Sequence, residues 1–244
     1  MNYKSVLFLF SFLLSVLSAA AVRSNEPVSE IRFRTLAVSG NIEGVYFRDG
    51  SGAQVELKAV DYVRSPIYRA APGGPLVIYR LLPPLEGETE PVPEVLERID
   101  WPARTCPFLL LVGTQGDSFS FSLTPDDTGT FPMGSFRIYN TSALPVVIQV
   151  GDVMAQLVPG ESKVLNPDFD PEGRGALFQV AARVGDEPRI VYSNLWNSSQ
   201  TQRTLVFIHN RNNPRAPIGL KRLHESEMVL RREQRSGLEG QETD

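Results

Sequence analysis

Cysteine and histidine are the side chains best suited to nucleophilic catalysis, and this 244-residue chain holds few of either. Cys106 is the only cysteine, and the two histidines are His209 and His224. A catalytic thiolate needs a nearby base and a partly exposed, electropositive setting. His224 falls in a charged C-terminal tail, where no scaffold is expected to hold it. A G-x-S-x-G elbow is absent from the sequence, so a serine hydrolase of that type has no support.

A candidate metal site lies in the acidic run DFDPEG, which places Asp168, Asp170 and Glu172 at alternate positions before a glycine. This pattern resembles the opening of a calcium-binding loop, where oxygen ligands alternate. It then departs from that loop, because the twelfth position is Gln179 and prolines flank and interrupt the run. A solvated acidic loop is the default interpretation, and weak Ca²⁺ binding by the three carboxylates is the alternative. One cysteine and two distant histidines cannot build a zinc site. No other cofactor is expected.

The elements that must position these residues are strands. Short runs rich in β-branched and aromatic residues, such as IRFRTLAV, PLVIYRL and SFSFSL, are bounded by glycine, proline, asparagine and aspartate. The chain holds 19 glycines and 19 prolines, which fall between these runs. Many short strands without long helices predict an all-β fold of antiparallel β-sandwich type. A single barrel or one large sandwich is the alternative.

Three short matches, in the same order, predict two tandem copies of one module. Residues 32–34 (RFR) match 135–137 (SFR), Pro75-x-Val77-Ile78-Tyr79 matches Pro188-x-Ile190-Val191-Tyr192, and 104–111 match 203–210. The last match aligns Cys106 with Leu205, and His209 with Leu110. Both candidates then occupy strand positions held by leucine in the other copy, which favours packing over catalysis. Trp101 and Trp196 each precede the third match of their own copy, which predicts a packing role for both.

One segment of the second copy resembles bacterial exported β-sandwich (Ig-like) modules of unknown function. It is PVVIQVGDVMAQLVPGESKVL, with a PGES turn at residues 159–162. The resemblance covers about 90 residues. It implies the fold and implies nothing about chemistry.

The first 21 residues predict a secretory signal peptide. Lys4 precedes an apolar run from Val6 to Leu17, and small residues allow cleavage after Ala20 or Ala21. An uncleaved anchor is the alternative, but the run is shorter than the roughly 18 to 20 apolar residues that cross a bilayer. No later run is apolar enough to span a membrane. An exported chain that lacks disulfides fits a secreted or periplasmic bacterial protein.

The charge of the chain argues against one class of partner. The formal net charge is −4, and the arginines are scattered through strand-like segments. Binding to a phosphate backbone needs clustered lysine and arginine, so nucleic acid is not expected. Asn140 and Asn197 match the glycosylation sequon, which matters only in a host that glycosylates.

A proline-rich acidic segment, residues 82–103, is the candidate for partner binding. It reads as a long loop inside the first module, with Pro93 able to start one helical turn and a much shorter connection in the second copy. Loops of this length are often functional or disordered, and a mere covering loop is the default interpretation. The expected organisation is a signal peptide at 1–21, sandwiches at 30–124 and 134–223, a linker at 125–133, and a charged, partly disordered tail at 224–244 that could start as a helix.

These observations together predict an exported, non-enzymatic structural or protein-interaction module of the cell envelope. The alternative is a secreted ligand-binding module for a glycan or Ca²⁺. An enzyme with an unrecognised site is the third possibility. Oligomeric state is not determined by the sequence.

Overall fold

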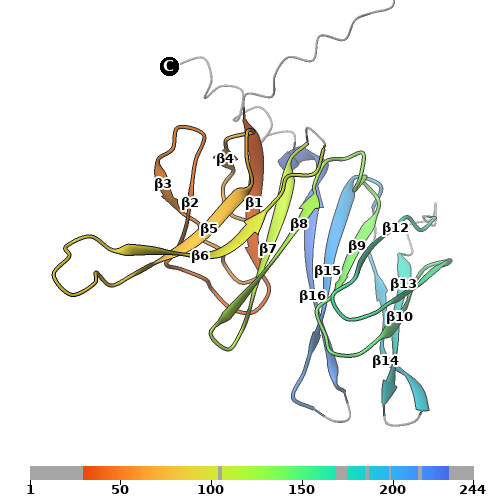
Figure 1. Cartoon of the computed structure of the whole chain (residues 1–244). Coiled ribbons are helices and arrows are strands. Elements are labelled where there is room, and N and C mark those ends of the chain that lie inside the picture. The colour runs from red at the N-terminus through yellow and green to blue at the C-terminus, as the bar shows by residue number, and fades with distance from the viewer. Residues whose placement is uncertain are drawn as a thin grey trace, which may run out of the picture.

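The structure is a computed structural model that describes residues 30–103, 106–168, 175–184, 187–197, 199–213 and 216–230. It contains sixteen β-strands and one short helical turn at residues 227–230, which confirms the all-β prediction. Four four-stranded sheets form two sandwiches (Figure 1). The predicted signal peptide at 1–21 lies outside the described residues.

The first sandwich is built from the first eight strands. One sheet has the order β4-β1-β7-β8 and the other has the order β3-β2-β5-β6. Strand β1 pairs with β7 in parallel, whereas the remaining pairs are antiparallel. The strands are β1 (Ile31–Ala37), β2 (Val45–Arg48), β3 (Gln54–Glu56), β4 (Tyr68–Ala70), β5 (Leu76–Leu82), β6 (Val92–Ile99), β7 (Phe108–Gln115) and β8 (Ser118–Pro125).

The second sandwich repeats this topology strand for strand. Its sheets have the orders β12-β9-β15-β16 and β11-β10-β13-β14, and β9 pairs with β15 in parallel as β1 does with β7. The strands are β9 (Phe136–Asn140), β10 (Val146–Val150), β11 (Val153–Leu157), β12 (Ser162–Leu165), β13 (Ala176–Val184), β14 (Glu187–Trp196), β15 (Gln202–Asn210) and β16 (Ile218–Ser226). Strand β16 therefore extends three residues into the segment expected to be a tail.

Each sandwich has its own hydrophobic core between its two sheets. Phe33, Phe47, Ile78 and Leu110 belong to the first core and are at most 1% exposed. The second core contains the corresponding kinds of residue, among them Phe136 and Phe178. Alternation along each strand explains this arrangement, because side chains of one parity face the partner sheet.

The tandem-copy prediction holds at the level of strands, with one of its three matches intact. Phe33 on β1 and Phe136 on β9 are equivalent, since each is the first residue of its parallel pairing. Each also contacts the tryptophan of its own sandwich, Trp101 at 5.8 Å and Trp196 at 6.2 Å between ring centroids. Both tryptophans pack against the core, as the sequence predicts.

The tyrosine match is wrong. Tyr79 lies on β5 and Tyr192 lies on β14, which are not equivalent strands. The true counterpart of Pro188-x-Ile190-Val191 is Pro93-x-Val95-Leu96 on β6. Both hairpins carry a β-bulge at this place, with Leu96 and Val191 as the unpaired extra residues.

The third match, 104–111 with 203–210, is displaced by three residues. The pairing of the parallel strands makes Phe108 equivalent to Thr204, and Leu109 equivalent to Leu205. Cys106 precedes β7 and is not a strand residue, so the proposed equivalence of Cys106 with Leu205 is also wrong.

The expected loop at 82–103 contains a strand. Residues Val92–Ile99 form β6, which pairs with β5, and Pro93 begins no helix. The second sandwich holds the equivalent hairpin, β13 with β14. Its connection is shorter, as the sequence predicts, because only residues 185–186 separate β13 from β14, whereas residues 83–91 separate β5 from β6. Residues 93–99 (PEVLERI) mix apolar and charged side chains, and this pattern fits a half-exposed strand once the extra residue of the bulge is allowed for.

The two sandwiches meet through their inner sheets (Figure 1). Leu36, Leu109 and Leu111 from the first face Tyr139, Leu205 and Phe207 from the second. By the corrected alignment these are equivalent positions on β1 and β7 and on β9 and β15. The contact therefore joins the same surface of both copies, as in an isologous dimer.

Tyr62 marks the edge of this contact. It adopts a left-handed backbone conformation with φ of 52°, and its ring packs edge-on against Phe207 at 5.3 Å. Its hydroxyl donates to the carbonyl of Val38 at 3.2 Å. A left-handed aromatic residue costs free energy, which these contacts offset.

A buried cluster of four charges closes the other end of the junction. Arg64 of the first sandwich forms ion pairs with Asp126 of the connecting segment and Glu225 of β16. Arg203 of β15 donates to Glu225 at 2.8 Å and pairs with Asp126 at 3.2 Å. The four side chains are between 2% and 10% exposed. Burial lowers the pKa of Arg64, but the carboxylates of Asp126 and Glu225 outweigh it and raise that pKa above its ordinary value.

The segment at 125–133, expected to be a polar linker, is held in place by two arginines. Arg203 donates to the carbonyls of Asp126 at 3.1 Å and Phe131 at 3.2 Å, and Arg137 donates to that of Thr130 at 3.2 Å. The ring of Phe131 lies between both guanidinium groups, at 4.6 Å from each. This cation–π arrangement fixes the path between the sandwiches.

We expect Glu225→Gln to lower the free energy of unfolding by about 3–5 kcal/mol, because it leaves two buried arginines with one carboxylate. Glu94→Gln is the matched control, since it removes a carboxylate from the surface pair with Arg80, where both side chains are about 41–42% exposed. That change should cost less than about 1 kcal/mol. Denaturant unfolding of both variants measures the difference, and equal costs would contradict a structural role for the cluster.

Candidate functional site

The cysteine and the histidines do not form a catalytic pair. Cys106 lies beside Asp127, to which its thiol hydrogen bonds, near the start of β15. His209 lies near the other end of β15, six residues after Arg203, which is roughly 20 Å along a strand. Its Nδ1 contacts the Asn210 carbonyl oxygen at 2.9 Å. A thiolate and a base this far apart cannot exchange a proton directly.

His224 lies on strand β16, contrary to the expectation of an unsupported tail. Its Nδ1 is 3.0 Å from the Thr204 hydroxyl on the neighbouring strand. Partial burial, followed by the nearby charge of Arg222, lowers the pKa of His224 below its ordinary value. The side chain is partly exposed, and the groups that act on it are the Thr204 hydroxyl and the charge of Arg222.

The candidate calcium residues are only partly described. Asp168 lies just after β12, where its backbone N–H donates to Asp152 Oδ1 at 3.2 Å. Asp170 and Glu172 lie outside the described residues, so calcium binding stays a prediction. Among the residues that the structure does describe, no three histidine, cysteine or acidic side chains gather closely enough to hold a metal ion. The same part of the chain contains no helix long and apolar enough to cross a membrane.

One glycosylation sequon is closed by the fold. The Asn140 side chain is 1% exposed, and its amide donates to the carbonyls of Leu144 at 2.8 Å and Leu157 at 3.2 Å. Asn197 is exposed after β14. A glycan on the folded chain would therefore need Asn197.

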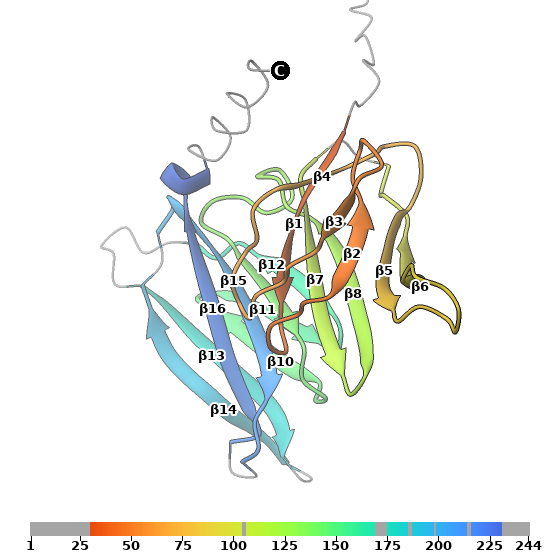
Figure 2. The same ribbon diagram turned by 90° about the vertical axis from the view of Figure 1, so that its left-hand side faces the viewer.

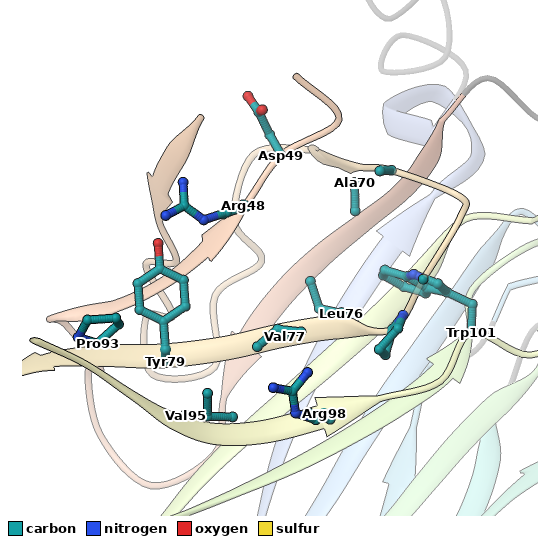
Figure 3. Close-up of a pocket in the computed structure, with 13 residues that line it drawn as sticks. Arg48, Asp49, Ala70, Leu76, Val77, Tyr79, Pro93, Val95, Arg98 and Trp101 are labelled. Atoms are coloured by element: carbon teal, nitrogen blue, oxygen red, sulfur yellow. The ribbon is translucent and has the colours of Figure 1, made fainter. Parts of the chain in front are cut away.

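A pocket lies on the outer sheet of the first sandwich (Figure 3). Its volume is about 410 Å³, within the usual range for small-ligand sites. The lining comes from the end of β2, the turn after β4, and the β5–β6 hairpin; it comprises Arg48, Asp49, Ala70, Ala71, Gly74, Pro75, Leu76, Val77, Tyr79, Pro93, Val95, Arg98 and Trp101. Four of these, Pro93, Val95, Arg98 and Trp101, belong to the segment 82–103 that the sequence predicts as a binding element.

Strand pairing explains why these side chains share one face. Val77 pairs with Arg98, and Tyr79 pairs with Val95, so each pair projects to the same side of the sheet. Ile78 and Tyr79 are consecutive residues of β5, so they face opposite sides of the sheet, with Ile78 in the core. The extra residue of the β-bulge, Leu96 on β6, brings Val95 opposite Tyr79. In Figure 3, Arg48 and Tyr79 lie at one end of the pocket and Trp101 at the other, with Arg98 between them.

The two arginines of the pocket lack a counter-ion within the described part of the chain. Arg48 donates one N–H to the Gly52 carbonyl at 3.0 Å and makes no ion pair. The Arg98 side chain makes no hydrogen bond or ion pair with the described residues. The neighbouring carboxylate of Glu97 accepts the backbone N–H of Arg98. Asp49 is the acidic residue among those that line the pocket, and its carboxylate accepts hydrogen bonds from its own turn.

The turn at 49–53 accounts for Asp49. Its Oδ1 accepts from the Ser51 hydroxyl at 2.7 Å and from the backbone N–H groups of Ser51 and Ala53. The bond from the Ser51 hydroxyl, with help from the backbone donors, lowers the pKa of Asp49 below its ordinary value. Figure 3 shows its carboxylate directed away from Tyr79 and Val95. The pocket therefore presents positive charge beside an apolar lining.

Trp101 adds a buried donor. Its indole Nε1 has no hydrogen-bond partner among the described residues and is shielded from solvent. The equivalent indole of Trp196 donates to the Tyr192 hydroxyl at 2.9 Å. Glu97 stands at the position of Tyr192 by the bulge alignment, and its side chain does not cap Trp101.

The equivalent face of the second sandwich carries no such arginines. Pairing registers place Gln149 at the position of Arg48, Ser193 at that of Arg98, and Ala181 at that of Tyr79. Ile190 replaces Val95 and is 62% exposed, compared with 47% for Val95. One scaffold thus carries two different outer faces.

Sequence reasoning missed Arg48 and Arg98. The available signal was the alignment of PEVLER (93–98) with PRIVYS (188–193), which sets Arg98 against Ser193. The stronger resemblance of the two proline–tyrosine strings concealed it.

Comparison of the chain with models of known protein families finds no match, and comparison with curated protein sequences finds none.

We expect the imidazole pKa of His224, followed by NMR, to lie below about 6.5, and Arg222→Gln to raise it by removing a nearby positive charge. Because the folded pKa is the lower one, the unfolded chain takes up the proton first. The stabilising contribution of His224 is therefore present above about pH 6.5 and is lost as the pH falls toward the folded value. Arg189→Gln, on the far edge strand, is the control that should leave the pKa unchanged.

Proposed function

We propose that this chain is an exported, non-enzymatic interaction module of the cell envelope, which binds its partner through the outer sheet of the first sandwich. The pocket formed by the segment 82–103 together with Arg48 and Tyr79 is the observation that carries this proposal. Two arginines that have no ion pair among the described residues, beside an apolar lining, are a feature of recognition sites.

Three further features support binding over catalysis. Cys106 lies beside one end of β15, and His209 lies near the other end of that strand. His224 is tied to Thr204. The pocket offers two guanidinium groups beside an apolar lining, which suit recognition of an acceptor-rich group.

The alternative of a glycan-binding module is less well supported. Sugar recognition commonly uses an exposed aromatic face, whereas the Trp101 ring packs against Phe33 and Phe108. Tyr79 is 6% exposed. Neither ring offers a free stacking platform at the pocket.

The experiment for this proposal is capture of partners from envelope extract by the mature chain and by Val95→Glu. A buried or interfacial charge at a central apolar contact should reduce capture of a specific partner by about tenfold or more. Ile190→Glu is the matched control, because Ile190 occupies the equivalent position after the equivalent bulge. A point substitution is used because deleting residues 86–99 would remove the whole of strand β6.

Retention of every specifically captured protein by Val95→Glu, or equal losses with Ile190→Glu, would contradict a binding surface on the first sandwich. Circular dichroism of both variants shows whether the fold is kept, and thermal unfolding should agree between them to within a few degrees.

We also expect the exported form to lack residues 1–20 or 1–21. Mass spectrometry of the intact protein from the extracellular or periplasmic fraction measures this, with the chain from whole cells as reference. An exported chain that retains Lys4 would contradict cleavage.

A further inference from the structure

The charge of the pocket selects the ligand. The chain is acidic overall, with a formal net charge of −4, yet Arg48 and Arg98 face the same pocket without an ion pair in the described residues. A guanidinium group presents paired N–H donors that match the two oxygens of a carboxylate. An anion with that geometry is therefore the complement of this site.

The remaining lining selects what the anion is attached to. Pro75, Leu76, Val77 and Val95 are apolar, and Leu76 belongs to the core. The volume of about 410 Å³ accommodates an aliphatic group the size of an amino-acid side chain together with its carboxylate. A highly hydrated polyanion would leave this apolar surface unused.

The indole of Trp101 lines the same pocket and differs from its counterpart Trp196 in its hydrogen bonding. A buried N–H without a partner is costly, and native structures seldom leave one. The second sandwich satisfies the same N–H with the Tyr192 hydroxyl, an oxygen acceptor. The Trp101 side chain lines the pocket although its N–H is shielded, so a ligand there changes the surroundings of its indole, whereas the indole of Trp196 keeps its own acceptor in the second sandwich.

We propose that the pocket of the first sandwich binds a carboxylate joined to an aliphatic group, with Arg98 and Arg48 holding the carboxylate. This inference rests on the proposed function, since it names the chemistry recognised at the same surface. The carboxylate belongs either to the C-terminus of a polypeptide or to a free small acid, and the experiment separates these two sources.

The experiment is an NMR titration of the ¹⁵N-labelled mature chain, read at the two indole N–H signals. The probes are 4-methylpentanoate, the peptide acetyl-Gly-Ser-Ala-Leu with a free C-terminus, and the same peptide as its C-terminal amide. Trp101→Phe assigns the signals. Both carboxylates should shift the signal of Trp101 and leave that of Trp196 in place, and the amide should shift neither.

Variants taken from the second sandwich test the two arginines. Arg98→Ser and Arg48→Gln should each weaken carboxylate binding by about tenfold to a hundredfold, the usual effect of losing a charged hydrogen bond. Ser193→Arg is the matched control and should leave the affinity unchanged. Tighter binding of the peptide assigns the site to a polypeptide C-terminus, whereas equal affinity assigns it to small acids.

Equal binding of the amidated peptide, an unchanged affinity in Arg98→Ser, or no shift at saturating probe would overturn the inference. Loss of partner capture in Val95→Glu together with no carboxylate binding would leave the proposed function standing and remove this ligand class. If the pocket binds carboxylates but Val95→Glu leaves partner capture unaffected, the ligand class stands and the proposed partner-binding function is removed.

Discussion

The buried charge cluster at the junction is the constraint on which the arrangement of the molecule depends. Two arginines and two carboxylates are stable away from water only when all four are present, because each unpaired charge is costly to bury. Arg64 belongs to the first sandwich, Asp126 to the connecting segment, and Arg203 and Glu225 to the second. The sandwiches therefore cannot separate without exposing or orphaning these groups. Leu36, Tyr139 and their neighbours supply the apolar area, and the charges supply a single relative orientation.

Fixing the inner sheets to each other decides which surfaces are available for function. Both inner faces are used in the junction, so the outer sheets are the broad faces left to solvent. The two outer sheets share their strand pairing and their β-bulge. Each also has a proline three residues before the extra residue of the bulge, Pro93 before Leu96 and Pro188 before Val191. They differ in the residues that project outward. A tandem repeat offers two sequences on one backbone, so an outward position that differs between them, such as Arg98 and Ser193, does not require one particular residue for the strand to form.

The sequence predicts the strands, the sandwich type, the two copies and the packing of both tryptophans, since these depend on local alternation and composition. It does not predict the registers. The bulge adds one residue to β6 and to β14, which displaces any match that assumes an unbroken period of two. The charge cluster joins Arg64 to Glu225, which are 161 residues apart, and no local pattern pairs them. His224 looked unsupported because the strand that holds it carries charged residues on its exposed side.

Because the sequence does not predict the strand registers, it predicts only part of the pocket. Segment 82–103 stands out by composition, but Arg48 arrives from another strand, and the bulge at Leu96 decides which residue of β6 lies opposite Tyr79. Once the registers are known, the comparison of the two sandwiches isolates the change. The scaffold tolerates Gln149 and Ser193 at the positions of Arg48 and Arg98, so the arginines are not needed to form the sheet. Two like charges on one face repel each other, and a fold gains no stability from placing them there without a counter-ion, which the described part of the chain does not supply. The bound anion that we propose would supply it.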